Sequence, residues 1–205
     1  MGNELTSKPY KNSDYIRDLV QSQLLMELNL SKFIDSNQLI KISKKYSVKG
    51  HSKTLEKSWI QLLGMGEFDG IWNENTFQEF ISPIERQKGS RLILEKNTVI
   101  AATFASAAIY ETKEVGRLDF VVTHPVHRKK GLGKNICIAV INHFIEKKYN
   151  KVILQTDDWR ISAIAVYLKL GFKPVFTSKK LEEKWKEIIN TYFKDFKIKS
   201  IKPDK

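Results

Sequence analysis

The sequence predicts an α/β fold, because strand-like and helix-like segments alternate through its second half. Strands are indicated where β-branched and apolar residues form short runs between turn residues, at residues 91–95, 99–107, 118–123, 151–156 and 173–177. The composition of Lys96-Asn97-Thr98 predicts that the first two strands form a hairpin. Helices are indicated after the third and fourth strands, where apolar residues recur every three or four positions.

The first eighty or so residues carry mainly helical patterns. Helices are expected from Ser13 or Asp14 to about Leu24, over residues 33–42 and over residues 54–63. We therefore expect residues 25–66 to form a helical insertion packed on the core. A short helix then opens at Asn73 or Asn75 and stops at Pro83.

The end of the chain predicts one more helix. Ser178 is placed as its cap, and an apolar stripe must cover part of the sheet. The stripe consists of Leu181, Trp185, Ile188, Tyr192 and Phe196. We expect a single domain over residues 1–196 and a basic tail over residues 197–205.

Length and composition narrow the class of protein. The chain has 205 residues and a net charge of +12, from 35 Lys and Arg against 23 Asp and Glu. The basic residues are spread along the chain, which favours a general compositional bias over a nucleic-acid surface. No run approaches the ~18 apolar residues of a membrane span, and the single Cys137 precludes an internal disulfide. We expect a cytoplasmic protein with no membrane partner, and a homodimer is left open.

The segment after residues 118–123 has the composition of an anion-binding turn. It reads Arg128-Lys129-Lys130-Gly131-Leu132-Gly133 and leads directly into a helical pattern. Glycines let successive N–H groups converge, and the helix dipole with flanking cations favours phosphate oxygens. The turn is neither a P-loop, because no GK[ST] follows, nor a dinucleotide fingerprint, because Ile136 occupies the third glycine position. In the helix we expect Asn142, His143, Glu146 and Lys147 to face away from the core.

Two motifs in the region Arg117–Phe172 resemble those of the GNAT superfamily of N-acyltransferases. The first is R/Q-x-x-G-x-G/A, matched from Arg128 to Gly133, after a strand that ends in x-P-x-x-R. The second is N-x-x-A-x-x-x-Y-x-x-x-G-F, matched at Ala163, Tyr167, Gly171 and Phe172, with Arg160 in place of the Asn. The resemblance implies a GNAT-like, mixed and mostly antiparallel sheet flanked by helices.

The resemblance also implies that acetyl-CoA is the acyl donor. Its pyrophosphate would lie on the amides of the turn, and its pantetheine would pair with the preceding strand, which splays from the next one. The implied binding residues are Val121, Val122, Thr123, Arg128, Lys129, Lys130, Gly131, Leu132, Gly133 and Lys134. Arg160 would donate a hydrogen bond to the pantetheine arm or to a phosphate.

Two residues are candidates for the proton transfers. Tyr167 matches the family's general-acid tyrosine, and a phenol with a pKa of about 10 is protonated at neutral pH; the alternative is an ordinary core tyrosine. Asp119 is a candidate base, and its alternative is an ion pair with Arg117 or Lys113. Gln155 stands where some family members carry a Glu, and an amide cannot accept the proton.

The acceptor side is expected to combine carboxylates with indole rings. The residues concerned are Asp69, Trp72, Asp119, Asp157, Asp158 and Trp159. Such a set suits a cationic amine, whereas Asp157 and Asp158 have the alternative role of capping the next helix. The sequence therefore predicts acetyl-CoA-dependent N-acetylation of a primary amine on a small molecule or a protein. A CoA-binding domain without catalysis and a basic nucleic-acid-binding protein remain as alternatives.

No metal is expected in the site. His124 and His127 are separated by a proline turn, and no carboxylate or second cysteine stands near them in the order that a zinc site needs. We expect these histidines to shape the turn.

Overall fold

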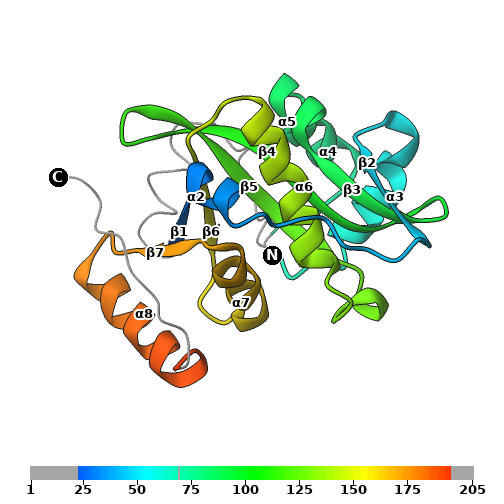
Figure 1. The fold of residues 1–205 in the computed structure, drawn as a ribbon. Coiled ribbons are helices and arrows are strands. Elements are labelled where there is room, and N and C mark those ends of the chain that lie inside the picture. The colour runs from blue at the N-terminus through cyan, green and yellow to red at the C-terminus, as the bar shows by residue number, and fades with distance from the viewer. Residues whose placement is uncertain (1–22, 69, 195–205) are drawn as a thin grey trace, which may run out of the picture.

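The computed structural model describes residues 23–68 and 70–194, and its centre is one seven-stranded sheet (Figure 1). The strand order is β2-β3-β4-β5-β6-β1-β7, and every neighbouring pair is antiparallel except β5 and β6. The bounds are β1 Leu24–Asn29, β2 Tyr46–Gly50, β3 Arg91–Glu95, β4 Thr98–Tyr110, β5 Lys113–Thr123, β6 Lys151–Thr156 and β7 Lys173–Val175. The prediction of a mixed, mostly antiparallel sheet is confirmed.

Helices cover both faces of this sheet. Helix α6 crosses the face turned toward the viewer in Figure 1, with α7 beside it, whereas α3 and α4 lie behind the sheet and α5 lies next to α6, where Glu85 meets His143. Helix α8 packs at the far end, next to β7. The bounds are α2 Leu30–Asp35, α3 Lys53–Leu63, α4 Glu74–Ile81, α5 Ile84–Gly89, α6 Leu132–Glu146, α7 Ile161–Leu170 and α8 Lys179–Tyr192, with the 3-10 turn η1 at Pro125–His127.

The prediction of a helical insertion over residues 25–66 is wrong for most of residues 25–50. Residues 24–29 form β1 and residues 46–50 form β2, and the helix expected over residues 33–42 is only the short α2. Strand β1 lies between β6 and β7 and is buried from Leu24 to Leu28. A strand buried on both faces is a nearly continuous apolar run, here interrupted by the buried Glu27, and periodicity alone does not separate such a run from a helix. Most of the helix expected before Leu24 lies outside the described residues.

Other predicted elements agree with the structure. Asn73 caps α4 in a reciprocal capping box with Thr76, and the Ser178 side chain accepts from the Leu181 amide at the start of α8. One stripe residue was placed wrongly, because Tyr192 is exposed and the neighbouring Phe193 is buried instead. Phe196 and the expected basic tail lie outside the described residues, and the extent of the domain stays a prediction.

Helix α6 packs closely on the sheet at Gly116 of β5. A Cβ atom there would lie 2.7 Å from the ring of Phe144, so only glycine allows this approach. The expectation that His143 faces away from the core is wrong: it is 4 % exposed and its Nε2 lies 2.7 Å from Glu85. The reason is α5, a helix that the sequence reading did not include and that covers this side of α6.

Among the helices of residues 23–68 and 70–194, none is both long and apolar enough to cross a membrane. The cytoplasmic location stays a prediction.

Candidate active site

The sheet opens between β5 and β6. These parallel strands pair only at Gly116 with Val152 and at Arg117 with Ile153, and then continue without pairing to Thr123 and Thr156. In the described part of the chain, β5 therefore has no neighbouring strand on this side beyond Arg117. Backbone N–H and C=O groups on such an edge are free to pair with an extended ligand.

A β-bulge bends β5 within the opening. Asp119 pairs with Phe104 and Val122 with Ala102, so that two residues of β5 stand opposite Thr103 alone. Phe120 lies at the bulge with φ +50°, a left-handed conformation that costs an L residue roughly 1–2 kcal/mol. Strain of this kind persists only where the surrounding structure compensates it, and it concentrates at functional sites.

The basic turn joins the end of β5 to the start of α6. Lys129 and Gly131 have left-handed φ values of +60° and +75°, and Gly131 is the N-cap residue of the 15-residue helix. No side chain caps the first turn of α6, so its N–H groups stay available at the positive end of the helix dipole. A Cβ built at Gly133 meets only the Thr123 hydroxyl, at 3.6 Å.

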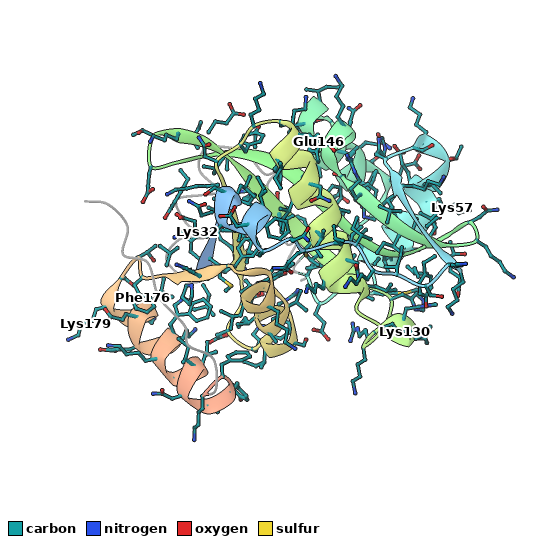
Figure 2. The ribbon with its side chains drawn as sticks, viewed as in Figure 1. Lys32, Lys57, Lys130, Glu146, Phe176 and Lys179 are labelled. Carbon is teal, nitrogen blue, oxygen red and sulfur yellow. The ribbon has the colours of Figure 1, made fainter. Side chains whose placement is uncertain are left out.

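Cations surround these amides. Arg128, Lys129 and Lys130 are exposed, and Figure 2 shows Lys130 on the turn at the edge of the molecule. The Lys130 ammonium donates to the Val126 carbonyl at 3.0 Å, which folds the turn upon itself. The residues present therefore fit the pyrophosphate of a CoA thioester, since they combine converging N–H groups with positive charge.

His127 connects the turn to strands β2 and β3. Its Nδ1 lies 3.3 Å from the Tyr46 hydroxyl of β2 and its Nε2 lies 3.6 Å from Glu95 of β3. Desolvation and the nearby Lys130 lower the pKa of His127, so it is mostly neutral at pH 7. Within residues 23–68 and 70–194 no group of three or more His, Cys, Asp or Glu residues gathers to hold a metal ion.

Tyr167 lies on α7, which ends at Gly171 in the left-handed conformation that the motif predicts. The side chain is 6 % exposed and packs in the core shared by α6, α7 and α8. Burial raises the pKa of Tyr167 far above its usual range; the neighbouring Cys137 thiol raises it further and Arg160 opposes the shift. The phenol therefore stays protonated at neutral pH.

Asp119 takes part in an ion pair on the bulged strand. Its Oδ1 lies 2.8 Å from Arg117 Nε, and its Oδ2 accepts from Arg117 Nη2 at 3.0 Å and from the Ser106 hydroxyl at 2.5 Å. Of the two roles anticipated for Asp119, the ion pair with Arg117 is present. Its role as a base stays a prediction, and the engaged oxygens do not favour it.

The other acidic residues expected at the acceptor side are paired as well. Asp157 lies 3.3 Å from Arg160 and accepts from Gln23 at 2.8 Å, and Asp158 lies 2.5 Å from Lys184 of α8. Neither carboxylate caps α7: its N-cap residue is Arg160, and no side chain hydrogen-bonds the first turn. That alternative is therefore wrong. Asp69 lies outside the described residues.

Aromatic rings line this side of the opening. Trp72 stacks on Phe104 at 5.9 Å and meets the edge of Phe120 at 4.9 Å, whereas Trp159 is 56 % exposed. The guanidinium of Arg160 lies 4.7 Å from the Phe68 ring and 4.8 Å from the Trp159 ring. Arg160 thus bridges the segment before α4 and the start of α7 by cation–π contacts, instead of presenting a free side chain.

Sequence reasoning missed the residues that support the bulge. Thr103, Ser106 and Arg86 belong to β4 and α5, outside both motifs, yet they are buried and hydrogen-bonded close to Asp119. The available signal was a set of polar residues, Thr103 and Ser106, within an otherwise apolar strand. Phe68 was missed too, because a single aromatic residue in a loop carries no pattern.

A parallel strand that parts from its neighbour before a glycine-bounded helix N-terminus is the arrangement that the resemblance to the GNAT superfamily implies. The sequence matches the model of the acetyltransferase (GNAT) family over residues 58–172, more than half of the chain. The protein therefore belongs to the acetyltransferase (GNAT) family, whose acyl donor is acetyl-CoA. No curated protein matches the sequence significantly.

Solved structures share the fold at low sequence identity. A transcriptional regulator from Bacillus halodurans C-125 aligns with a TM-score of 0.55 and 16 % identity, over 65 % of this chain and 95 % of the other. Glucosamine-6-phosphate N-acetyltransferase from Arabidopsis thaliana gives 0.51 and 20 %, over 62 % and 90 %. A chain of the NatC complex bound to Gag peptide and CoA gives 0.54 and 11 %, over 61 % and 82 %. These similarities establish the fold alone.

Proposed function

We propose that this protein transfers an acetyl group from acetyl-CoA to a primary amine of a small molecule or a protein. The observation that carries the proposal is the opening of β5 from β6 directly before the uncapped start of α6. It sets a free strand edge and an anion-binding turn in one continuous segment. Family membership supplies the reaction class.

The donor is held by backbone groups of this chain. The amides of residues 129–134, with Arg128, Lys129 and Lys130, neutralise the pyrophosphate, and the free edge of Val121–Thr123 pairs with the pantetheine arm. Acetyl-CoA supplies an acyl group already activated as a thioester. The chain must then orient that group, admit the amine and return a proton to the leaving sulfur.

Tyr167 is the proposed proton donor. Its raised pKa keeps the hydroxyl protonated at neutral pH, so a proton is present to donate. The same shift makes the phenol a weaker acid, so the proposal rests on its place in the motif and not on the pKa. Tyr167 also contributes to the core through its contact with Phe172, at 6.0 Å between ring centroids. The proposed role therefore concerns the hydroxyl alone, since the ring packs whether or not it donates.

The acceptor is proposed to be an amine that is cationic in solution. Exposed aromatic surface at Trp159 and half-buried surface at Trp72 suits an ammonium group or its alkyl body. The nearby carboxylates of Asp119 and Asp157 are already paired with arginines of this chain. The rings, rather than a free carboxylate, are therefore expected to bind the acceptor.

One experiment tests donor binding and turnover together. Acetyl-CoA at about 100 times its dissociation constant should raise the stability of the fold by about 2.7 kcal/mol. Release of the CoA thiol is then followed over a panel of cationic, neutral and anionic amines. The protein's own Cys137 does not interfere, because burial raises its pKa to about 12. An unchanged melting temperature with acetyl-CoA would refute the proposed function.

A CoA-binding domain without catalysis remains a second candidate on one observation. Gln155 cannot take a proton, and both oxygens of Asp119 are engaged by Arg117 or Ser106. The same experiment separates the two functions. Stabilisation by acetyl-CoA without thiol release from any amine would favour binding alone, whereas release with one class of amine would favour the enzyme.

A further inference from the structure

A side chain of β4 hydrogen-bonds to the backbone of the bulge in β5. The Thr103 hydroxyl donates to the Asp119 carbonyl at 2.9 Å, and Thr103 is fully buried. A bulge interrupts the regular ladder and leaves backbone groups beside it without their usual partners. The hydroxyl supplies such a partner at the residue that precedes the left-handed Phe120.

The side-chain carboxylate of Asp119 is held by two further side chains. Ser106 of β4 and Arg117 of β5 donate to its Oδ2, and Arg117 is the last residue of β5 that pairs with β6. Ser106 in turn accepts from Arg86 Nε at 2.8 Å. Asp119 is therefore fixed relative both to β4 and to the point where the sheet opens.

We propose that Thr103, Ser106 and Arg117 hold Asp119 as a clamp that sets the shape of the bulge. The clamp thereby orients the free edge of Val121–Thr123 toward the bound thioester. In this role Asp119 is a positioning residue and not the general base. The inference rests on the proposed function, because its catalytic consequence requires acetyl transfer.

Geometry separates the clamp from a base. A general base must offer a lone pair to the proton that it removes. The Asp119 oxygens already accept from one hydroxyl and from a guanidinium, so protonation would break contacts that hold the strand. The Thr103 contact is made by the backbone carbonyl, which has no part in proton transfer. Substitution of Thr103 therefore tests the positioning role of Asp119 without altering its carboxylate.

The test compares Thr103→Val with Thr103→Ser. Valine keeps the shape and removes the hydroxyl, whereas serine keeps the hydroxyl and removes a methyl group. We expect Thr103→Val to lower kcat by about tenfold or more, because small displacements of the reacting groups are costly. Thr103→Ser should restore most of the rate, the pH profile should keep its shape, and CoA affinity should fall less than kcat because the turn proposed to hold the pyrophosphate is untouched.

Hydrogen exchange at residues 118–124 gives a readout that does not depend on activity. The clamp predicts faster exchange there in Thr103→Val than in the wild type or Thr103→Ser. Should Thr103→Val fail to fold, Ser106→Ala tests the clamp from the carboxylate side with the same measurements.

Two outcomes would overturn the clamp. One is a lowered melting temperature in Thr103→Val with kcat and local exchange unchanged; the other is a loss of rate in Asp119→Asn that Thr103→Val does not share. If the wild type binds acetyl-CoA but acetylates no amine, the proposed function fails. Local exchange then decides on the clamp alone.

Discussion

The two sides of the opening between β5 and β6 are built in different ways. The proposed donor side is one contiguous segment, residues 121–134, which offers backbone amides and exposed cations. The acceptor side is assembled from side chains of separate elements, among them Phe68, Trp72, Asp119 and Arg160. The first side is therefore readable as a motif, whereas the second exists only after the chain has folded.

Their charges differ as well. Cations of the donor turn remain exposed to a ligand, whereas the acidic residues of the acceptor side are neutralised by Arg117, Arg160 and Lys184. An anionic donor bound as proposed would thus meet uncompensated positive charge. The acceptor meets aromatic surface with little net charge, so its selection should depend on shape and π contacts more than on ion pairing.

The largest effect should come from placing a negative charge on the donor side. Gly133→Glu adds a carboxylate to the first turn of α6, where the helix itself tolerates an acid and where the Cβ has room. The fold should hold, since replacing a helical glycine stabilises by up to about 1 kcal/mol. Acetyl-CoA affinity should fall by about 100-fold or more, measured by calorimetry.

Gly133→Gln is the matched control for this variant. Glutamine has the size of glutamate without its charge, so it should retain much more affinity than Gly133→Glu. Equal affinity in both variants would show that size rather than charge governs the turn. If Gly133→Glu bound acetyl-CoA as tightly as the wild type, the pyrophosphate would have to bind elsewhere. The proposed difference between the two sides would then be wrong.

The next effect concerns Tyr167, the proposed proton donor. Tyr167→Phe removes one hydroxyl and keeps the ring, so kcat should fall by about 100-fold with acetyl-CoA affinity nearly intact. Because the folded pKa lies above the unfolded one, Tyr167 contributes stability below about pH 10 that is lost at higher pH. The phenylalanine variant should therefore lose less stability between pH 9 and 11, measured by thermal melts. Unchanged turnover would make Tyr167 a core residue only.

The donor side shows how much a sequence can reveal. The spacing of Arg128, Gly131 and Gly133 predicts a turn whose amides converge, and the structure has left-handed φ values at Lys129 and Gly131. The positions of Tyr167 and Gly171 likewise predict a helix and its end. Such features depend on neighbours a few residues apart, so local sequence is sufficient to specify them.

The acceptor side and the clamp could not be predicted in this way. Thr103 and Asp119 lie on different strands and meet only through the register of β4 and β5. The inner strand β1, buried from Leu24 to Leu28, and the polar edge strand β2 also depend on neighbours that are distant in sequence. A bulge at a phenylalanine breaks the usual preference for glycine at positive φ, so no residue type marks it.

An intermediate effect, on stability, is expected at Gly116, where α6 packs against β5. Gly116→Ala would place a methyl group 2.7 Å from the Phe144 ring, and that ring is fully buried. Overpacking of this kind typically costs about 1–3 kcal/mol, to be measured by chemical denaturation. Phe144→Leu in the same chain should restore part of the loss. Full stability of Gly116→Ala alone would show that α6 can move away from β5.

The smallest effect should come from Trp159, and it tests the acceptor side directly. Its ring is 56 % exposed and lies over Arg160 near the opening, so Trp159→Leu leaves the core intact. An exposed cation–π contact is worth about 0.5–1 kcal/mol, which corresponds to a two- to fivefold rise in KM for a cationic amine. Tyr192→Leu is the control, because Tyr192 is equally exposed at 58 % and is the last residue of α8, about two helical turns beyond the Lys184 that pairs with Asp158. For such an amine, kcat/KM should also rise with pH toward the pKa of the amine, since only the neutral form attacks. If Trp159→Leu and Tyr192→Leu have equal KM values for cationic acceptors, or if anionic amines prove to be the best substrates, the aromatic surface does not select the acceptor.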